Sequence, residues 1–221
     1  MPLSSQELSG RTTLLTRKAD NAALYLALTT AEKSRAINDK AGFIADPRYR
    51  LLRVDHRLDA ARGNEFEVAL VDDGELSVAF YDRVTLLHFR GINRQIAQNR
   101  VWRSSNSRHD NALRDITRKV FFDYLIQDHD ILLADDLMTD GGRFNWHRQV
   151  SHAIEQGLHV LTYDSVTLAL RSIKLQRELN DLMDQAWSHS HHVRFRALVS
   201  QFPLGAQPED IELLNAWMAS A

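Results

Sequence analysis

The sequence predicts a mixed α+β fold, in which helices flank a twisted and mainly antiparallel sheet. Short runs rich in β-branched and aromatic residues predict strands at 66–71, 76–80, 84–89 and 96–103. A polar link that contains Gly74 separates the first two runs, which is typical of a hairpin turn. The short links between successive runs favour an antiparallel meander.

The next segment alternates helices and strands with little loop between them. Its periodicity predicts a helix over about 112–127, a strand over 130–136, a helix that carries Trp146 and ends near Gly157, and a strand over 158–163. Such a β-α-β-α-β order is typical of domains whose ligand clefts lie at the ends of strands. We therefore expect a ligand site at one of these strand ends.

Both ends of the chain carry helical patterns. Residues 3–42 have apolar residues at mostly helical spacing, and Leu168 to Trp187 carries a second apolar stripe. A stripe of this kind must be buried against something. We therefore predict one domain over 1–165 with a helical N-terminus, and a helical extension over 166–221 that packs on it or forms a homodimer interface.

Composition narrows the class of protein. The chain has 221 residues, of which 44% are hydrophobic and 25% charged, so it can form a soluble globular core. It has no cysteine, which excludes disulfides, thiolate zinc sites, iron–sulfur clusters and a cysteine nucleophile. It contains no apolar run of the roughly 20 residues that span a bilayer, and its N-terminus lacks signal-peptide features. We therefore expect a cytoplasmic protein without a membrane partner.

Positive charge is concentrated between residues 83 and 119. This segment holds nine basic residues but only two acidic ones, although the formal net charge of the chain is −2. A solvated surface and a site for phosphates explain such a cluster about equally well. The phosphates would belong either to a cofactor or to a nucleic-acid backbone.

The order of elements resembles that of the GNAT N-acetyltransferase superfamily over about residues 20–164. It also resembles shorter, phage-encoded acyltransferase-like proteins, which combine a strand ending in Trp-Arg, a later strand ending in Asp, and a Thr-x-x-Gly segment before a helix with Trp. The matching segments here are Trp102–Arg103, Ala134–Asp136, Thr139–Gly142 and Trp146.

This resemblance implies a cofactor, acetyl-CoA or another acyl-CoA, and an amine-bearing acceptor. In the family, the loop between a strand and the next helix holds the cofactor pyrophosphate through backbone amides. The implied cofactor-binding residues are Trp102, Arg103, Ser104, Arg108, Asn111 and Ala112. The chain departs from the family pattern at Asn111 and Leu113, which stand where the family has small residues.

Three residues are candidates for proton transfer. Asp135 ends a predicted strand, where a carboxylate can orient an attacking amine or accept its proton. Neighbouring residues of a regular strand point to opposite faces, so Asp135 and Asp136 are not expected to enter the same cleft, and Asp135 is slightly preferred. A structural role, in which one of the two carboxylates caps the following turn, explains the pair equally well. Ala153 stands where the family often has a Tyr that protonates the departing thiolate of CoA. His152 or Tyr163 would take over this role, or the reaction would proceed without a proton donor from the protein.

A metal site is not predicted. The tightest group among the ten histidines is His189–His192, and no separate residue completes a ligand set, so a polar turn is the better interpretation. Two functional classes remain open. One is an acyltransferase, and the other is a noncatalytic nucleic-acid- or protein-binding module on a degenerate acyltransferase fold. A steep salt dependence of binding would indicate nucleic acid.

Overall fold

The computed structural model describes residues 14–44, 46–58, 63–89, 94–134, 140–164, 167, 169–188, 195–204 and 216. The chain divides into two compact units. Unit 1 comprises Met1–Leu86 and Asn99–Tyr124, and unit 2 comprises Leu87–Gln98 and Leu125–Ala221. The predicted mixed α+β class with mainly antiparallel strands is confirmed.

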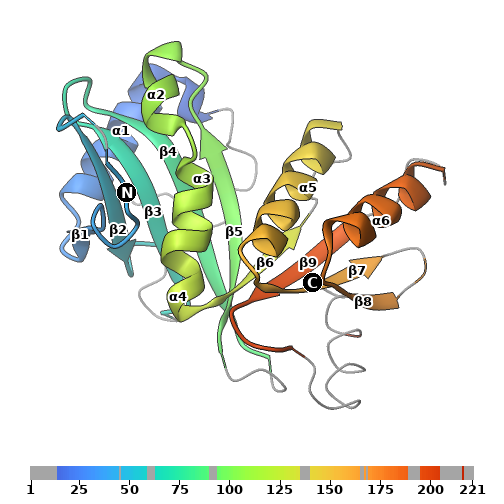
Figure 1. Ribbon diagram of the computed structural model, residues 1–221. Helices are drawn as coiled ribbons and strands as arrows, with labels where there is room; N and C mark the ends of the chain where they lie inside the picture. The colour runs from blue at the N-terminus through green and yellow to red at the C-terminus, as the bar shows by residue number, and fades with distance from the viewer. Residues whose placement is uncertain are drawn as a thin grey trace. The chain divides into compact units, whose positions relative to one another are not determined.

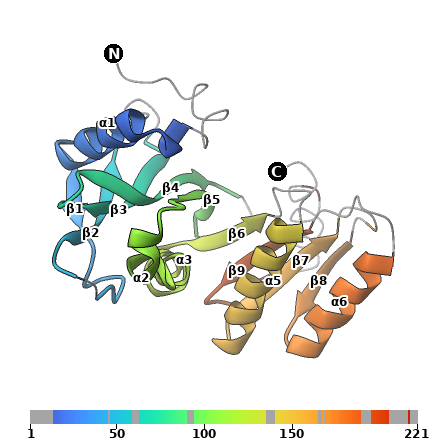
Figure 2. The same cartoon turned by 90° about the horizontal axis from the view of Figure 1, so that it is seen from above.

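Unit 1 contains five strands in the order β1-β2-β3-β4-β5. They are β1 (Ser34–Ala36), β2 (Tyr49–Asp55), β3 (Glu65–Asp72), β4 (Ser77–Leu87) and most of β5 (Ile96–Arg103). The helical elements are η1 (Leu14–Thr16), α1 (Lys18–Thr29), η2 (Ser107–His109), α2 (Asp110–Leu113), α3 (Ile116–Arg118) and the π-helical η3 (Lys119–Leu125). Helix α1 covers one face of these strands, and α2 and α3 lie on the other (Figures 1 and 2).

Helix α1 is tied to the sheet by the side chain of Asn21. Its Nδ2 donates to the carbonyl oxygens of Leu15 and Val78, at 3.1 and 3.0 Å, and its Oδ1 accepts from the Val78 amide at 2.7 Å. Burial of Leu28 against Leu52 and other apolar residues of the sheet adds the hydrophobic contribution. The start of α1 is thereby fixed beside the first residues of β4.

The predicted hairpin is formed by β3 and β4. The Asp72 Oδ1 accepts from the amides of Gly74 and Glu75, at 3.0 and 3.2 Å, which closes the turn as an Asx-type motif. The runs predicted as separate strands at 76–80 and 84–89 form the single strand β4, which continues past a bulge near its start.

Unit 2 has the strand order β5-β6-β9-β7-β8. Its further elements are α4 (Ile126–Asp128), β6 (Asp130–Ala134), α5 (Asp140–Glu155), β7 (His159–Asp164), β8 (Ala169–Ile173), α6 (Gln176–Ser188) and β9 (Phe195–Ser200). Strands β5 and β6 are parallel over the pairs from Ile96 to Gln98, whereas β6, β9, β7 and β8 pair antiparallel. Helices α5 and α6 lie on the same face of the strands of unit 2 (Figures 1 and 2).

Trp146 belongs to the core of unit 2. Its indole Nε1 donates to the carbonyl oxygen of Leu133 at 3.3 Å, and its ring stacks on Phe195 with the ring centroids 5.3 Å apart. Helix α5 ends just before Gly157, as predicted, because this glycine adopts a φ of +72°, which closes the C-terminus. None of the helices in the described ranges is long and apolar enough to cross a membrane.

The predicted helical extension at 166–221 is corrected by the described part of this segment. Residues 169–173 form β8, and 195–200 form β9, which lies between β6 and β7 in the sheet. The predicted helix was too long, because Ala169–Ile173 form a strand and only the residues from Gln176 onward form a helix. A six-residue apolar run such as β9 has no periodicity that distinguishes it from a helix.

Two other predicted helices also differ from the structure. The helix expected to reach residue 42 ends at Thr29. It is followed by strand β1 at 34–36 and strand β2 at 49–55. The helix expected over 112–127 is interrupted at Asp115, whose φ of +58° is left-handed, so the segment consists of short helical turns. Periodicity alone does not report such a break.

Candidate functional site

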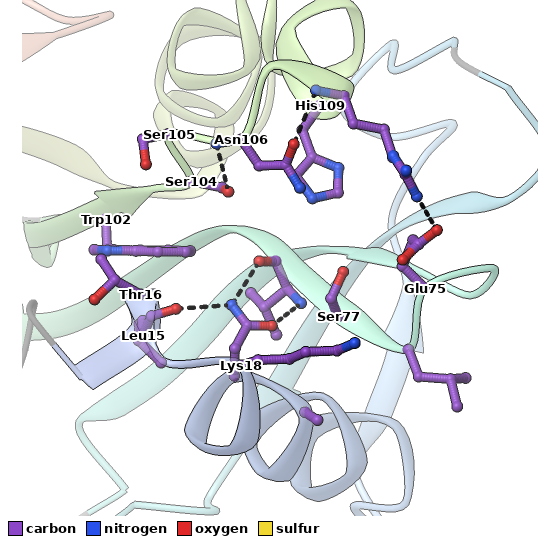
Figure 3. Close-up of a pocket in the computed structure, with 15 residues that line it drawn as sticks. Leu15, Thr16, Lys18, Glu75, Ser77, Trp102, Ser104, Ser105, Asn106 and His109 are labelled. Carbon is purple, nitrogen blue, oxygen red and sulfur yellow. Dashed lines mark hydrogen bonds and ion pairs between the residues drawn. The ribbon is translucent and has the colours of Figure 1, made fainter.

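A pocket of about 400 Å³ lies in unit 1 at the carboxyl end of β5. Its walls come from the start of α1, from the turn between β3 and β4, and from the loop that follows β5 (Figure 3). Most lining side chains are polar, and Trp102 adds an aromatic surface. A pocket of this volume is large enough for a small molecule.

The predicted cofactor-binding segment contributes to this pocket in part. Trp102, Ser104 and Arg108 line it. By contrast, Arg103 donates a hydrogen bond to the Leu113 carbonyl oxygen at 2.8 Å, outside the lining. Asn111 is exposed and Ala112 is buried, and neither belongs to the pocket wall.

His109 is the most deeply buried titratable residue of the pocket wall. Only 3% of its surface is exposed, and its Nδ1 lies 3.0 Å from the Tyr49 hydroxyl. The same nitrogen is 3.7 Å from Oδ2 of Asp72, which is fully buried. Burial lowers the pKa of His109 below its ordinary value, and the Asp72 carboxylate opposes that shift.

Arg48 completes the group around His109. Its Nη2 donates to the Tyr49 hydroxyl oxygen at 2.9 Å, and its Nε lies 3.7 Å from the Asp72 Oδ2. Burial raises the pKa of Tyr49, so this hydroxyl keeps its proton at neutral pH. The imidazole is therefore held by a phenol, a carboxylate and a guanidinium.

Hydroxyl and amide groups complete the polar lining. Ser77 Oγ is buried and has no hydrogen-bond partner among the described residues. In Figure 3, the side chains of Ser77 and His109 point into the same space from opposite sides. Asn106 is fixed in the loop, because its Oδ1 accepts from the Arg108 amide at 3.1 Å.

Much of the basic segment at 83–119 is neutralised by ion pairs. The pairs are Arg83 with Glu65 at 2.7 Å, Arg94 with Asp130 at 3.5 Å, Arg118 with Asp123 at 3.3 Å, and Arg108 with Glu75. Arg90 lies outside the described residues. The charge available to an external polyanion is therefore smaller than the sequence count indicates.

Of the three predicted proton-transfer residues, His152 and Tyr163 do not line the pocket. Asp135, like Asp136, lies outside the described residues, and so do His189–His192. His152 contacts Gln156 of its own helix, at 2.9 Å between the Nε2 atoms. Tyr163 is 2% exposed and packs in the hydrophobic core of unit 2. The described residues contain no group of three or more side chains arranged to hold a metal ion.

Sequence reasoning missed Tyr49, Asp72, Ser77 and His109 as site residues. Asp72 was recognisable only as part of a polar turn, and His109 only as part of a polar loop. Tyr49 and His109 are 60 residues apart in the chain, so no local spacing connects them. The one usable signal was the position of the loop, immediately after a strand.

The chain was compared with protein families, curated proteins and solved structures. No protein-family model matches the chain, and neither a curated protein nor a solved structure is significantly similar to it. The fold and the pocket therefore define the class: a mixed α+β protein with a ligand-sized polar pocket where a strand leads into a helical segment.

Proposed function

We propose that the protein is a GNAT-like N-acyltransferase, which transfers an acyl group, acetyl in the simplest case, from CoA to an amine. The pocket at the carboxyl end of β5 is the observation that carries this proposal. Strands β3 and β4 lead to β5, a helical segment, β6, α5 and β7, and this is the order on which the resemblance to the family rests.

The connection from β5 to β6 supports a ligand site at this position. The two strands are parallel and are joined by a helical crossover, as in a βαβ unit. Ligands of such units bind beyond the carboxyl ends of the strands, where loops carry variable side chains and helices begin. The pocket lies beyond the carboxyl end of β5, at Trp102 and the loop that follows it.

Arg108, in the short helix η2 that follows β5, is proposed to contact the cofactor pyrophosphate. It lines the pocket, whereas Arg103 lies outside the lining and donates to the Leu113 carbonyl oxygen. Guanidinium groups bind phosphates through paired, charge-assisted hydrogen bonds. Arg108 also pairs with Glu75, so phosphate binding would exchange one anionic partner for another.

Isothermal titration of the full chain with acetyl-CoA and with CoA tests the proposal. Arg108→Ala should weaken binding about tenfold, since it removes roughly 1.4 kcal/mol of charge-assisted contact. Arg118→Ala is the matched control, because Arg118 pairs with Asp123 and does not line the pocket, and its affinity should stay within twofold. Glu75→Gln should not weaken binding, because it releases Arg108.

Equal affinity in the wild type and in the Arg108→Ala variant would place the cofactor elsewhere. No detectable binding of either CoA species by the wild type would end the proposal. The nucleic-acid alternative has less support, because ion pairs occupy much of the basic segment. A steep fall of DNA affinity with salt would restore it.

A further inference from the structure

The imidazole of His109 is held entirely through one of its nitrogens. Nδ1 faces the Tyr49 hydroxyl at 3.0 Å and Asp72 Oδ2 at 3.7 Å, and the Tyr49 ring meets the imidazole edge-on at 81°. Because Nδ1 and Nε2 lie on opposite sides of the ring, Nε2 is left for the pocket that His109 lines. The ring thus presents one specific atom to a ligand.

The hydrogen-bond partners decide which nitrogen carries the proton. The Tyr49 oxygen accepts from Arg48, and its hydroxyl is 3.5 Å from the Arg108 carbonyl oxygen, which can accept its proton. The Asp72 Oδ2 lies 3.7 Å from Nδ1, and its negative charge favours a proton on that nitrogen. In that tautomer Nδ1–H donates to Tyr49, and Nε2 keeps its lone pair.

Burial favours the neutral form of the His109 imidazole. Burial lowers its pKa most, and Arg48 and Arg108 lower it further, whereas Asp72 and Glu75 raise it. A neutral imidazole with an unprotonated Nε2 can accept a proton. The carboxylate of Asp72 is close enough to stabilise the imidazolium that would form.

We propose that the pocket receives the acceptor amine and that His109 Nε2 is the general base that takes its proton. This inference rests on the proposed acyl transfer. The substrate class is a primary amine, in its neutral form at the moment of attack, that occupies the part of the pocket beside His109 and Trp102 and leaves the Arg108 side for the cofactor.

The chemical step balances without any further reagent. The amine nitrogen attacks the thioester carbonyl carbon of acyl-CoA, a C–N bond forms, and the proton of the nitrogen passes to Nε2 of His109. The C–S bond then breaks, and CoA leaves as a thiolate. The imidazolium proton passes to that sulfur, which gives an amide, CoA thiol and neutral His109.

Nitrogen NMR of the full chain labelled with ¹⁵N-histidine tests the base directly. The expected spectrum shows His109 as the Nδ1–H tautomer with a pKa below the ordinary value of about 6.5. Adding 2-phenylethylamine alone should shift the Nε2 resonance of His109 but not that of His129, a buried histidine outside the pocket. A proton on Nε2 in the free protein, or no shift with the amine, would overturn the inference.

Kinetics with acetyl-CoA and 2-phenylethylamine provide the second test. His109→Gln should lower kcat/KM by about 10²- to 10⁴-fold, the usual contribution of a general base, while the affinity for CoA stays within twofold. The wild-type rate should rise with pH through the His109 pKa, and the variant should lose that rise. His129→Gln is the control and should keep both the rate and the pH profile.

The two proposals fail in different ways. A wild type that does not bind CoA in calorimetry contradicts the acyltransferase function itself. A wild type that binds CoA and acetylates the amine, together with a His109→Gln variant of equal rate and pH profile, contradicts only the role of His109. Tyr49→Phe separates positioning from chemistry, because it should reduce kcat and alter the tautomer ratio without removing Nε2.

Discussion

The two units differ in what they bury. The described part of unit 1 encloses several ionisable side chains among its strands and loops, namely Glu67, Asp72, Asp82, Arg83 and His109. The described part of unit 2 buries mainly apolar side chains, with His129 and Asp130 as its ionisable exceptions. A buried charge lowers stability unless it is paired, so the stability of unit 1 depends on its buried ion pairs and hydrogen bonds. The candidate pocket lies in that unit.

Among the substitutions considered, the largest loss of stability is expected at Glu67, a buried residue of unit 1. Its carboxylate is 1% exposed, pairs with Arg57, and accepts from the Tyr81 hydroxyl at 2.6 Å. Glu67→Ala should lower the free energy of unfolding by about 3–5 kcal/mol, because it leaves a guanidinium and a phenol without their partner. Urea unfolding of both proteins measures the difference.

An exposed ion pair of unit 1 provides the control for Glu67. Glu75 pairs with Arg108 at the surface, where the two side chains are 44% and 54% exposed. Glu75→Ala should change the free energy of unfolding by less than about 1 kcal/mol. Similar losses in the two variants would show that burial does not set the contribution of these pairs.

Asp82 should make the stability of unit 1 depend on pH. It is fully buried, its Oδ2 accepts from Asn99 Nδ2 at 2.6 Å, and burial raises its pKa to about 7. Between pH 4 and 7 the unfolded chain loses this proton while the folded chain keeps it. The stabilisation is therefore complete at low pH and falls as pH rises to 7, by about 4 kcal/mol at 1.36 kcal/mol per pKa unit.

Asp82→Asn should remove this pH dependence, because an amide has no proton to lose in this range. Urea unfolding at pH 4, 6 and 8 should show the variant gaining stability relative to the wild type as pH rises. Asp73→Asn is a control of opposite sign, because hydrogen bonds from Arg50 lower the pKa of Asp73. Its contribution is present above the ordinary carboxyl pKa and is lost on acidification. Parallel pH curves for the wild type and Asp82→Asn would contradict the prediction.

The smallest effect is expected in the apolar core of unit 2. Trp146→Phe keeps an aromatic ring against Phe195 but removes the hydrogen bond to Leu133, so it should cost about 1–2 kcal/mol. Thermal unfolding followed by circular dichroism measures it. Phe144→Leu on the same helix is the control, since Phe144 is 66% exposed, and should change stability by no more than about 0.5 kcal/mol.

The sequence predicted those elements whose signal is local. Strand β5 has the bounds that were expected, and the β3–β4 hairpin and the end of α5 at Gly157 were recognised from turn chemistry. Strand β9 was missed, because a short run that is buried on both faces carries no alternation. Its place between β6 and β7 depends on pairing with distant segments, which no local pattern encodes.

The sequence predicted the residues of only one wall of the pocket. Trp102, Ser104 and Arg108 were expected beside a ligand, because they follow a strand that leads into a helix. The other walls come from α1 and from the β3–β4 turn, which join the pocket only when the sheet is assembled. The pairing of His109 with Tyr49 and Asp72 likewise exists only in three dimensions.

Asn21 acts as a one-residue substitute for a neighbouring strand. Its amide group offers the same donor and acceptor that a backbone peptide offers to an antiparallel partner, and it bonds both the N–H and the C=O of Val78. The N–H and C=O groups of Val78 are thus satisfied by a side chain rather than by a strand, at a residue that lines the pocket. Only an amide side chain can mimic a peptide in this way, because a carboxylate at the same position would place two acceptors face to face.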